Sequence, residues 1–272
     1  KKKIKIHFKV IIILFVFFLI LISIFFSNLN YKNHNQTKYL TFELFQMNNE
    51  IKNSNSNDSD KIYRNIIDNI KNSEAELLIF SENNYPYLVN DFNDLEINSF
   101  LKGNQKILIG ATRYEDEKYF NSILLMSKKE NNFFDKKILV PFGEFLPFRK
   151  HLQFMEKISG TQDFTSGVSK RILKLNDKIN IIPIICYEII FFWRIMNFNN
   201  YSADILINIT NDSWFGKKIG PYQHFYLSKI KAAEFNKILL RVSNNGISGV
   251  IDNYGSILQS TNLYEKKNIK GK

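Results

Sequence analysis

The sequence predicts an α/β domain that follows a single transmembrane helix. Short, strongly apolar runs typical of buried strands recur along the chain of 272 residues, and segments with helical periodicity lie between them. An uncharged apolar run, Val10–Phe26, precedes all of them. With 44% hydrophobic and 23% charged residues, the composition excludes a largely disordered chain.

The N-terminal run has the length and composition of a membrane span. A helix over residues 10–29 would be about 30 Å long, close to the roughly 30 Å apolar core of a bilayer. The run is longer than the apolar region of a signal peptide, and Phe25–Asn28 lacks the small residues of a cleavage site. Lysines cluster in residues 1–9, so the positive-inside rule predicts a cytoplasmic basic segment there and places the chain after the span across the membrane. Residues 30–38 are predicted to be a linker.

The charge and the cysteine count restrict the possible partners. A net charge of +11 suggests an anionic partner, but the lysines before the span account for part of it, and no nucleic-acid-binding module is recognisable. We therefore expect membrane lipid and no nucleic acid. A single cysteine excludes an intramolecular disulfide and a cysteine-rich zinc module, and with only four histidines we expect no metal or cofactor.

The remaining chain is predicted to form one domain over residues 39–265, with a tail at 266–272. It begins with a strand at Tyr39–Met47, an amphipathic helix at Asp58–Asn72 and a buried strand at Leu77–Phe80. Helical patterns return at Glu188–Met196 and Tyr222–Phe235. Further strands are predicted at Lys106–Ala111, Ser122–Ser127, Ile181–Cys186, Asp204–Ile209, Ile238–Val242 and Ser248–Asp252.

Three reactive side chains lie at or near the ends of these strands. Cys186 ends one apolar run, Glu82 follows another, and Lys136 precedes Ile138–Val140. Taken singly, each has an ordinary interpretation: a core thiol, a solvated carboxylate and a surface ammonium. Together they supply a coherent chemistry, in which a carboxylate with a raised pKa takes the thiol proton, the thiolate attacks a carbonyl carbon, and an ammonium stabilises the oxyanion.

The spacing of these residues and the words around them resemble a known family. The order Glu82, Lys136, Cys186 is similar to that of the nitrilase, or carbon–nitrogen hydrolase, superfamily. Longer words resemble the apolipoprotein N-acyltransferases within it, although Ser81–Asn84 departs from the usual family sequence around the glutamate. The matching words are Lys136–Pro147 with its VPFGE, Ile185–Glu188, Asn208–Gly216 followed by Gly220–His224, and Arg241–Gly246.

The resemblance implies a four-layer α-β-β-α nitrilase-type sandwich on the periplasmic side of a bacterial inner membrane. It implies a monomeric enzyme that moves an acyl chain from a phospholipid, through a cysteine thioester, to the N-terminal amine of a diacylated apolipoprotein. Cys186 would be the nucleophile, Glu82 the general base and Lys136 the oxyanion partner. Glu144 and Glu188 also match family glutamates needed for activity, and Tyr187 matches the residue after the nucleophile. Family members carry more membrane helices, so we expect this chain to be a fragment.

Two other functions remain open from the residues alone. One is a membrane-anchored amidase that hydrolyses a small amide with the same three groups; the other is a degenerate, non-catalytic binding module. We also expect His224 to be structural, and we expect part of the apolar loop Phe142–Phe148 to face the bilayer.

Overall fold

The protein divides into two compact units, Lys1–Tyr39 and Leu40–Lys272, which are described separately here. The computed structural model describes residues 9, 11–23, 39–49, 56–91, 95–152, 154, 156, 162–195 and 202–272.

The N-terminal unit contains helical residues at 11–23. Within the described residues, no helix combines the length and the apolar character needed to cross a membrane. Residues 10 and 24–29 of the predicted transmembrane helix lie outside the described part, as do residues 1–8 and 30–38. The membrane helix therefore stays a prediction.

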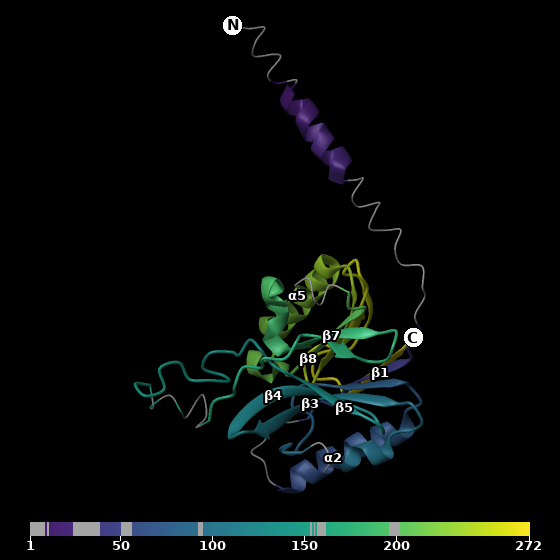
Figure 1. Cartoon of the computed structure of the whole chain (residues 1–272), viewed down its shortest axis with the longest axis vertical. Coiled ribbons are helices and arrows are strands. Elements are labelled where there is room, and N and C mark those ends of the chain that lie inside the picture. Colours follow the sequence, from purple (N-terminus) through teal and green to yellow (C-terminus); the bar gives the residue numbers. More distant parts are fainter. Residues whose placement is uncertain are drawn as a thin grey trace. The chain divides into compact units, whose positions relative to one another are not determined.

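The second unit contains two six-stranded sheets (Figure 1). The first has the order β12-β1-β2-β3-β4-β5 and the second the order β11-β10-β9-β8-β7-β6. The first sheet's strands are β1 (Phe42–Gln46), β2 (Leu77–Phe80), β3 (Lys106–Glu115), β4 (Lys118–Met126), β5 (Asn131–Asp135) and β12 (Lys267–Gly271). The second sheet's strands are β6 (Leu173–Lys174), β7 (Asn180–Ile185), β8 (Ile205–Thr210), β9 (Ile238–Ser243), β10 (Gly249–Ile251) and β11 (Ile257–Ser260).

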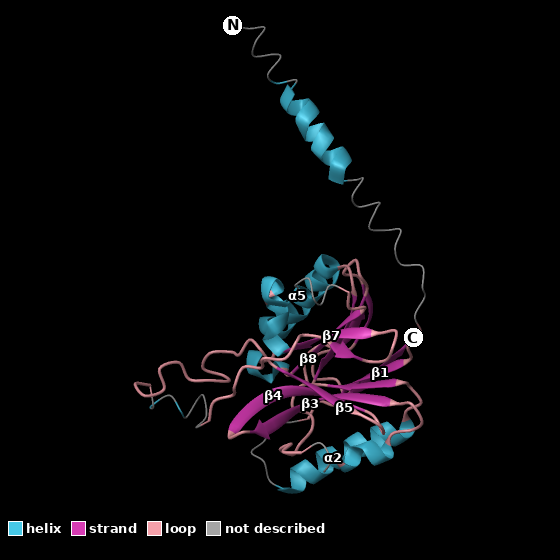
Figure 2. Cartoon of the chain, viewed as in Figure 1, coloured by secondary structure: helices cyan, strands magenta, loops and turns pink. Residues whose placement is uncertain are grey.

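Helices cover the outer faces of both sheets (Figure 2). Helix α2 (Ser56–Asn72) packs on the first sheet through one apolar core, and α4 (Phe192–Ile195) and α5 (Ile219–Phe235) pack on the second through another. A third core, between the sheets, contains side chains from both. The short helices η1 (Glu96–Phe100), η3 (Cys186–Ile190) and η4 (Asp212–Phe215) complete the described elements. The order helix, sheet, sheet, helix agrees with the predicted α-β-β-α sandwich.

Alternation along the strands explains why the runs are apolar throughout. In β2, Leu77 and Ile79 enter the core between the sheets, whereas Leu78 and Phe80 enter the core beneath α2. A strand with side chains on two buried faces needs apolar residues at every position. Strands β1, β2 and β3 are mutually parallel, and so are β7, β8 and β9. The turns that leave their carboxyl ends carry the candidate site, as is common in α/β sheets.

The structure corrects two predictions about the ends of elements. Residues 266–272 are not a tail, because β12 pairs antiparallel with β1 and completes the first sheet. Only Ile269 of β12 is buried, and this polar, lysine-rich pattern suits a sheet edge better than an internal strand. The helix predicted at Glu188–Met196 is divided into η3 and α4 at Phe191, whose backbone has a non-helical φ of −95° and ψ of 65°. Met196 lies outside the described residues.

Candidate active site

Cys186 lies at the point where β7 ends and η3 begins. It is 8% exposed, and its backbone has φ +52°, a left-handed conformation that non-glycine residues seldom adopt and that is often found at functional sites. Burial raises the pKa of the thiol, the Glu82 carboxylate raises it further and Lys136 opposes both, so that the pKa reaches about 12. The resting thiol is therefore protonated near neutral pH.

Glu82 lies in the turn after β2 and is 5% exposed. Its Oε1 accepts a hydrogen bond of 2.8 Å from the Asn121 amide, and its Oε2 accepts one of 2.8 Å from the backbone N–H of Asn211. Burial raises the pKa of this carboxyl above its ordinary value, although Lys136 and a hydrogen bond with the Cys186 thiol act in the opposite direction. The carboxyl is thus held in place beside the thiol with a raised proton affinity.

The turn that carries Glu82 depends on a close backbone approach. A Cβ atom on Gly110 would lie 2.5 Å from the Glu82 Cα, so only glycine fits on β3 at this position. The Asn84 side chain also accepts the N–H of Ser81 at 3.2 Å, and Asn83 has φ +51°. The unusual sequence Ser81–Asn84 therefore still forms a closed, hydrogen-bonded turn.

Lys136 follows β5 and is almost completely buried, with 1% exposure. Its Nζ lies 2.8 Å from Glu144 Oε2 and 3.7 Å from Glu82 Oε1. Burial alone would lower the pKa of this ammonium, but Glu82, Cys186 and Glu144 raise it overall, which keeps the group charged. The neighbouring Lys137 instead directs its backbone N–H to Glu188, 2.9 Å away. The geometry thus brings Lys136, not Lys137, to the other two predicted groups.

Glu144 and Asn121 connect the carboxyl and ammonium groups. Glu144 accepts the Val140 N–H at 2.9 Å through Oε2, and through Oε1 it accepts the Asn121 amide at 2.8 Å. The same Asn121 amide nitrogen donates to Glu82. Sequence reasoning missed Asn121; the only signal was a polar amide within a predominantly apolar strand segment.

Glu188 and Tyr187 lie close to Cys186 in sequence but have different surroundings. The Glu188 carboxylate is fully buried and makes two 2.7 Å hydrogen bonds with Arg171, and it also accepts the N–H groups of Lys137 and Ile138 at 2.9 and 3.1 Å. Burial alone would raise its pKa, but the Arg171 guanidinium and the N–H groups of Ile185 and Lys137 lower it overall. Glu188 therefore joins the lysine segment to the cysteine turn. Arg171, which supports it, was not predicted.

The half-buried ring of Tyr187 packs beside the candidate site. Its centroid lies 5.8 Å from that of Phe191, 6.4 Å from that of Phe215 and 6.2 Å from that of His224. Its backbone N–H belongs to the first turn of η3, where N–H groups lack acceptors within the helix.

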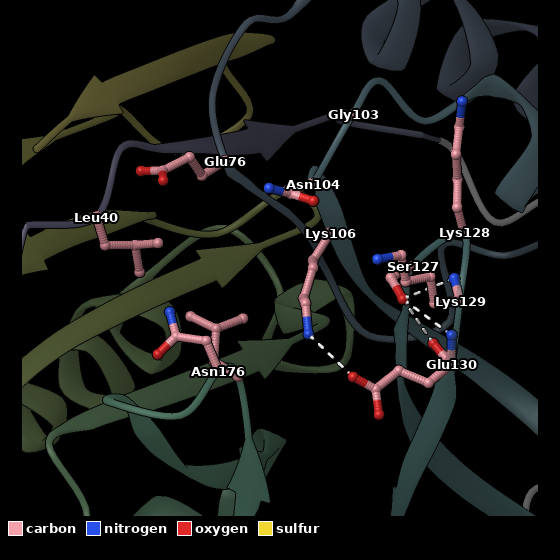
Figure 3. Close-up of a pocket in the computed structure, with 11 residues that line it drawn as sticks. Leu40, Glu76, Gly103, Asn104, Lys106, Ser127, Lys128, Lys129, Glu130 and Asn176 are labelled. Carbon is pink, nitrogen blue, oxygen red and sulfur yellow. Dashed lines mark hydrogen bonds and ion pairs between the residues drawn. The ribbon is translucent and has the colours of Figure 1, made fainter.

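A separate cavity lies at the opposite ends of the strands. It has a volume of about 340 Å³ and is lined by residues that include Glu76, Lys106, Lys128 and Glu130 (Figure 3). The Lys106 ammonium lies 3.6 Å from the Glu130 carboxylate, and none of the six predicted site residues is in its lining. Among the described residues, no group of three or more His, Cys, Asp or Glu side chains could hold a metal ion.

Solved structures share the fold defined by these two covered sheets. A carbon–nitrogen hydrolase superfamily protein from Xanthomonas campestris, XC1258, aligns with a TM-score of 0.63 and 14% identity over 86% of this chain and 90% of that one. Saccharomyces cerevisiae Nit3, a nitrilase superfamily member, aligns with a TM-score of 0.64 and 16% identity over 87% of this chain and 92% of its own. The fold of this domain is therefore the nitrilase-type α/β sandwich.

The chain belongs to the carbon–nitrogen hydrolase family, whose family model matches residues 44–269. It is similar to proteins named apolipoprotein N-acyltransferase. The Rickettsia typhi protein is 37% identical over 65% of this chain and 37% of its own length, and the Brucella melitensis protein is 34% identical over 69% of this chain and 38% of its own. The chain thus spans less than two fifths of the length of these relatives.

Proposed function

We propose that this chain carries the catalytic domain of an apolipoprotein N-acyltransferase, in which Cys186 holds the acyl group as a thioester. The observation that carries the proposal is the buried contact among Glu82, Lys136 and Cys186, in which the carboxyl has a raised pKa and the ammonium stays charged. The names of the relatives and the VPFGE and CYE words support an acyl transfer to an apolipoprotein.

In the first step Glu82 takes the thiol proton while the sulfur of Cys186 attacks the ester carbonyl of a phospholipid. The developing oxyanion is stabilised by the Lys136 ammonium and by the N–H of Tyr187. A carbon–sulfur bond forms, the ester carbon–oxygen bond breaks, and the proton passes from Glu82 to the departing oxygen, releasing a lysophospholipid. Because burial and Glu82 raise the pKa of the thiol to about 12, the resting thiol is protonated and the first step needs a base.

In the second step the N-terminal amine of a diacylated apolipoprotein attacks the thioester. Glu82 accepts a proton from the amine, an amide bond forms, the carbon–sulfur bond breaks, and the thiolate of Cys186 regains the proton. Glu144 acts as a positioning residue for the Lys136 ammonium, and Glu188 positions the backbone between the lysine and cysteine segments.

We further propose that residues 10–29 anchor the chain in the bacterial inner membrane with the domain on the periplasmic side. The uncharged run and the lysines before it support this orientation. Within the loop Phe142–Phe148, Leu146 is buried, whereas Phe142 and Phe148 are 43% and 79% exposed. Exposed phenylalanines beside a buried anchor suit a loop that contacts lipid.

Serine at Phe142 and Phe148 should lower turnover of a bilayer phospholipid several-fold more than turnover of a short-chain ester, because only the bilayer substrate needs the apolar contact of these exposed rings. The measurement is the ratio of the two turnover rates, with exposed Tyr254→Ser as a matched control. Equal losses on both substrates would rule out a lipid-contacting loop.

The activity is tested by product analysis. The full chain is mixed with phospholipid vesicles and a synthetic diacylated lipopeptide, and the peptide products are separated by mass. N-acylated peptide together with lysophospholipid is the expected result. Free fatty acid as the sole acyl product would indicate a hydrolase instead, and an absence of both products would indicate a non-catalytic module.

A further inference from the structure

A second buried charged cluster lies behind the nucleophile, and the reaction described above does not use it. Asp212 from η4, His224 from α5 and Arg241 from β9 are 1%, 3% and 0% exposed. Asp212 Oδ1 lies 2.8 Å from His224 Nδ1, and Arg241 Nη2 donates to Asp212 Oδ2 at 3.0 Å. The three elements therefore meet at one ion-paired carboxylate.

The position of that carboxylate is tightly constrained. Ser243 donates to Asp212 Oδ2 at 3.1 Å, and a Cβ on Gly246 would lie only 1.9 Å from the same oxygen. Burial would raise the pKa of Asp212, but the Arg241 guanidinium and the His224 ring lower it to about 2. Asp212 is therefore an anion at neutral pH and provides a fixed acceptor for Arg241.

The cluster reaches the nucleophile through one backbone carbonyl. His224 Nε2 lies 3.3 Å from the Cys186 carbonyl oxygen, and Asn208 Nδ2 lies 3.4 Å from the same oxygen. The histidine contact is attractive only when the ring hydrogen is on Nε2, because a carbonyl oxygen can only accept. Burial and the Arg241 guanidinium lower the pKa of His224, so the ring is neutral, and Arg241 Nη2, 3.1 Å from Nδ1, favours the tautomer with hydrogen on Nε2. The Cys186 carbonyl is thus held by two side chains from the second sheet and its covering helix.

Holding this carbonyl also fixes the N–H on the other side of the same peptide. The peptide between Cys186 and Tyr187 is planar, and its C=O and N–H groups point in opposite directions. The left-handed conformation of Cys186 is unfavourable for a non-glycine residue, so contacts with the surrounding structure must hold this peptide in place. The N–H in question is the Tyr187 donor that the proposed function assigns to the oxyanion.

We propose that Arg241, Asp212 and His224 form a positioning array that orients the 186–187 peptide so that the Tyr187 N–H points at the oxyanion. The proposal rests on the proposed function only in requiring that Cys186 becomes acylated. His224 acts through the backbone and exchanges no proton with the substrate. It is a positioning residue, and its role requires a hydrogen-bond donor at the position of Nε2.

The test compares two reactions of the same thiol in the full chain. Acylation by p-nitrophenyl acetate passes through an oxyanion, whereas alkylation by iodoacetamide does not. His224→Met removes the donor and should slow acylation by about 10²-fold, the usual loss for an oxyanion-hole donor, with a much smaller change in the alkylation rate. His224→Gln places an amide N–H near the position of Nε2 and should restore most of the acylation rate, whereas His224→Asn, which reaches only as far as Nδ1, should not.

The controls separate this proposal from the proposed function. The exposed His151→Met variant should match the unmodified chain in both reactions. Equal losses in acylation and alkylation, or no loss in His224→Met, would overturn the positioning role. If His224→Met fails to fold, the Gln and Asn variants decide alone, and equal rates for these two would overturn it. Acylation of the chain by p-nitrophenyl acetate but not by phospholipid would refute the lipid donor and leave the positioning role intact. If neither p-nitrophenyl acetate nor phospholipid leaves an acyl group on Cys186, both proposals are overturned.

Discussion

Glu82 and Glu188 are two buried carboxylates in the same candidate site, and their surroundings give them opposite proton affinities. Glu82 lies 3.7 Å from an ammonium that it shares with Glu144, and its pKa is raised. Glu188 has its own guanidinium, which makes two 2.7 Å hydrogen bonds, and its pKa is lowered. Burial raises the pKa of both carboxyl groups. The opposite overall shifts therefore come from the cation, because Arg171 pairs with Glu188 alone whereas Lys136 is shared by Glu82 and Glu144.

This comparison separates a group that can exchange a proton from one that maintains the structure. A carboxyl group that has a raised pKa and shares its only nearby cation with a second carboxylate can take a proton from a nearby thiol. A carboxylate with a bidentate partner and several N–H donors stays ionised and joins chain segments. Proximity in sequence to the proposed nucleophile therefore does not identify the proposed base: Glu188 is two residues from Cys186, whereas Glu82 follows a strand of the other sheet.

The largest expected effect is on the rate of acylation in Glu82→Gln. Loss of the proposed base should slow acylation of Cys186 by about 10²–10⁴-fold, because a thiol with a pKa of about 12 needs a base to take its proton before it attacks. The free energy of unfolding at neutral pH should not fall, since an amide is easier to bury than this carboxylate. Pre-steady-state kinetics measure the acylation rate, and urea unfolding measures the stability. A large loss of stability would show that Glu82, like Glu188, maintains the structure.

The next effect is on stability in Arg171→Met. Removing the guanidinium leaves Glu188 buried without its cation, which should lower the free energy of unfolding by about 3–5 kcal/mol. The exposed Arg194→Met is the matched control and should change stability by less than about 0.5 kcal/mol. If the two variants unfold at the same urea concentration, the loss of the Arg171–Glu188 ion pair does not lower the free energy of unfolding.

A smaller effect on rate is expected for Gly110→Ala. The new Cβ would lie 2.5 Å from the Glu82 Cα and must displace the turn, and a shift of about 1 Å at a reacting group costs about 10²-fold in rate. In Gly143→Ala, by contrast, the nearest atom is a Val140 side-chain carbon at 3.5 Å, an ordinary contact, so this variant should retain its activity. Equal acylation rates in the two variants would show that the backbone of Glu82 is not critical.

The smallest effect is the pH dependence of stability. The native pKa of Glu82 is raised above 4.5, so the stability from this group is present below about pH 4.5 and is lost as the pH rises through the native pKa. The native pKa of Glu188 is lowered, so its contribution is present above about pH 4.5 and is lost as the pH falls through the native pKa.

Urea unfolding at several pH values tests these signs. Glu82→Gln should gain stability relative to the parent chain as the pH rises from about 4 to 7, by about 1.4 kcal/mol for each unit of pKa shift. Glu188→Gln should lose more stability near pH 7 than near pH 4. Parallel profiles for the two variants would remove the contrast between the carboxylates.

The fold was predictable where a strand is buried on both faces, and less so at the sheet edges. Leu77–Phe80 is found as predicted because every residue is apolar. Strands β11 and β12 were missed because most of their residues are exposed and show no apolar pattern. The pairing of β12 with β1 also joins distant parts of the chain. Strand β6 was missed because it has only two residues, too few to show a periodicity.

The candidate site shows the same division. Cys186, Glu82 and Lys136 could be predicted as site residues because reactive side chains at or near strand ends supply a coherent chemistry, and their catalytic roles stay predictions. Asn121 and Arg171 were missed because their roles depend on partners 39 and 17 residues away in the chain, which no local pattern reveals.

The central claim, that Cys186 carries the acyl group and Glu82 activates it, is tested most directly by mapping the acyl adduct. The full chain is incubated with phospholipid alone and its peptides are analysed by mass spectrometry before and after hydroxylamine. The account predicts a hydroxylamine-sensitive acyl group on Cys186 that is absent from Cys186→Ala and nearly absent from Glu82→Gln. An adduct that forms at the same rate in Glu82→Gln, or on any residue other than Cys186, would contradict it.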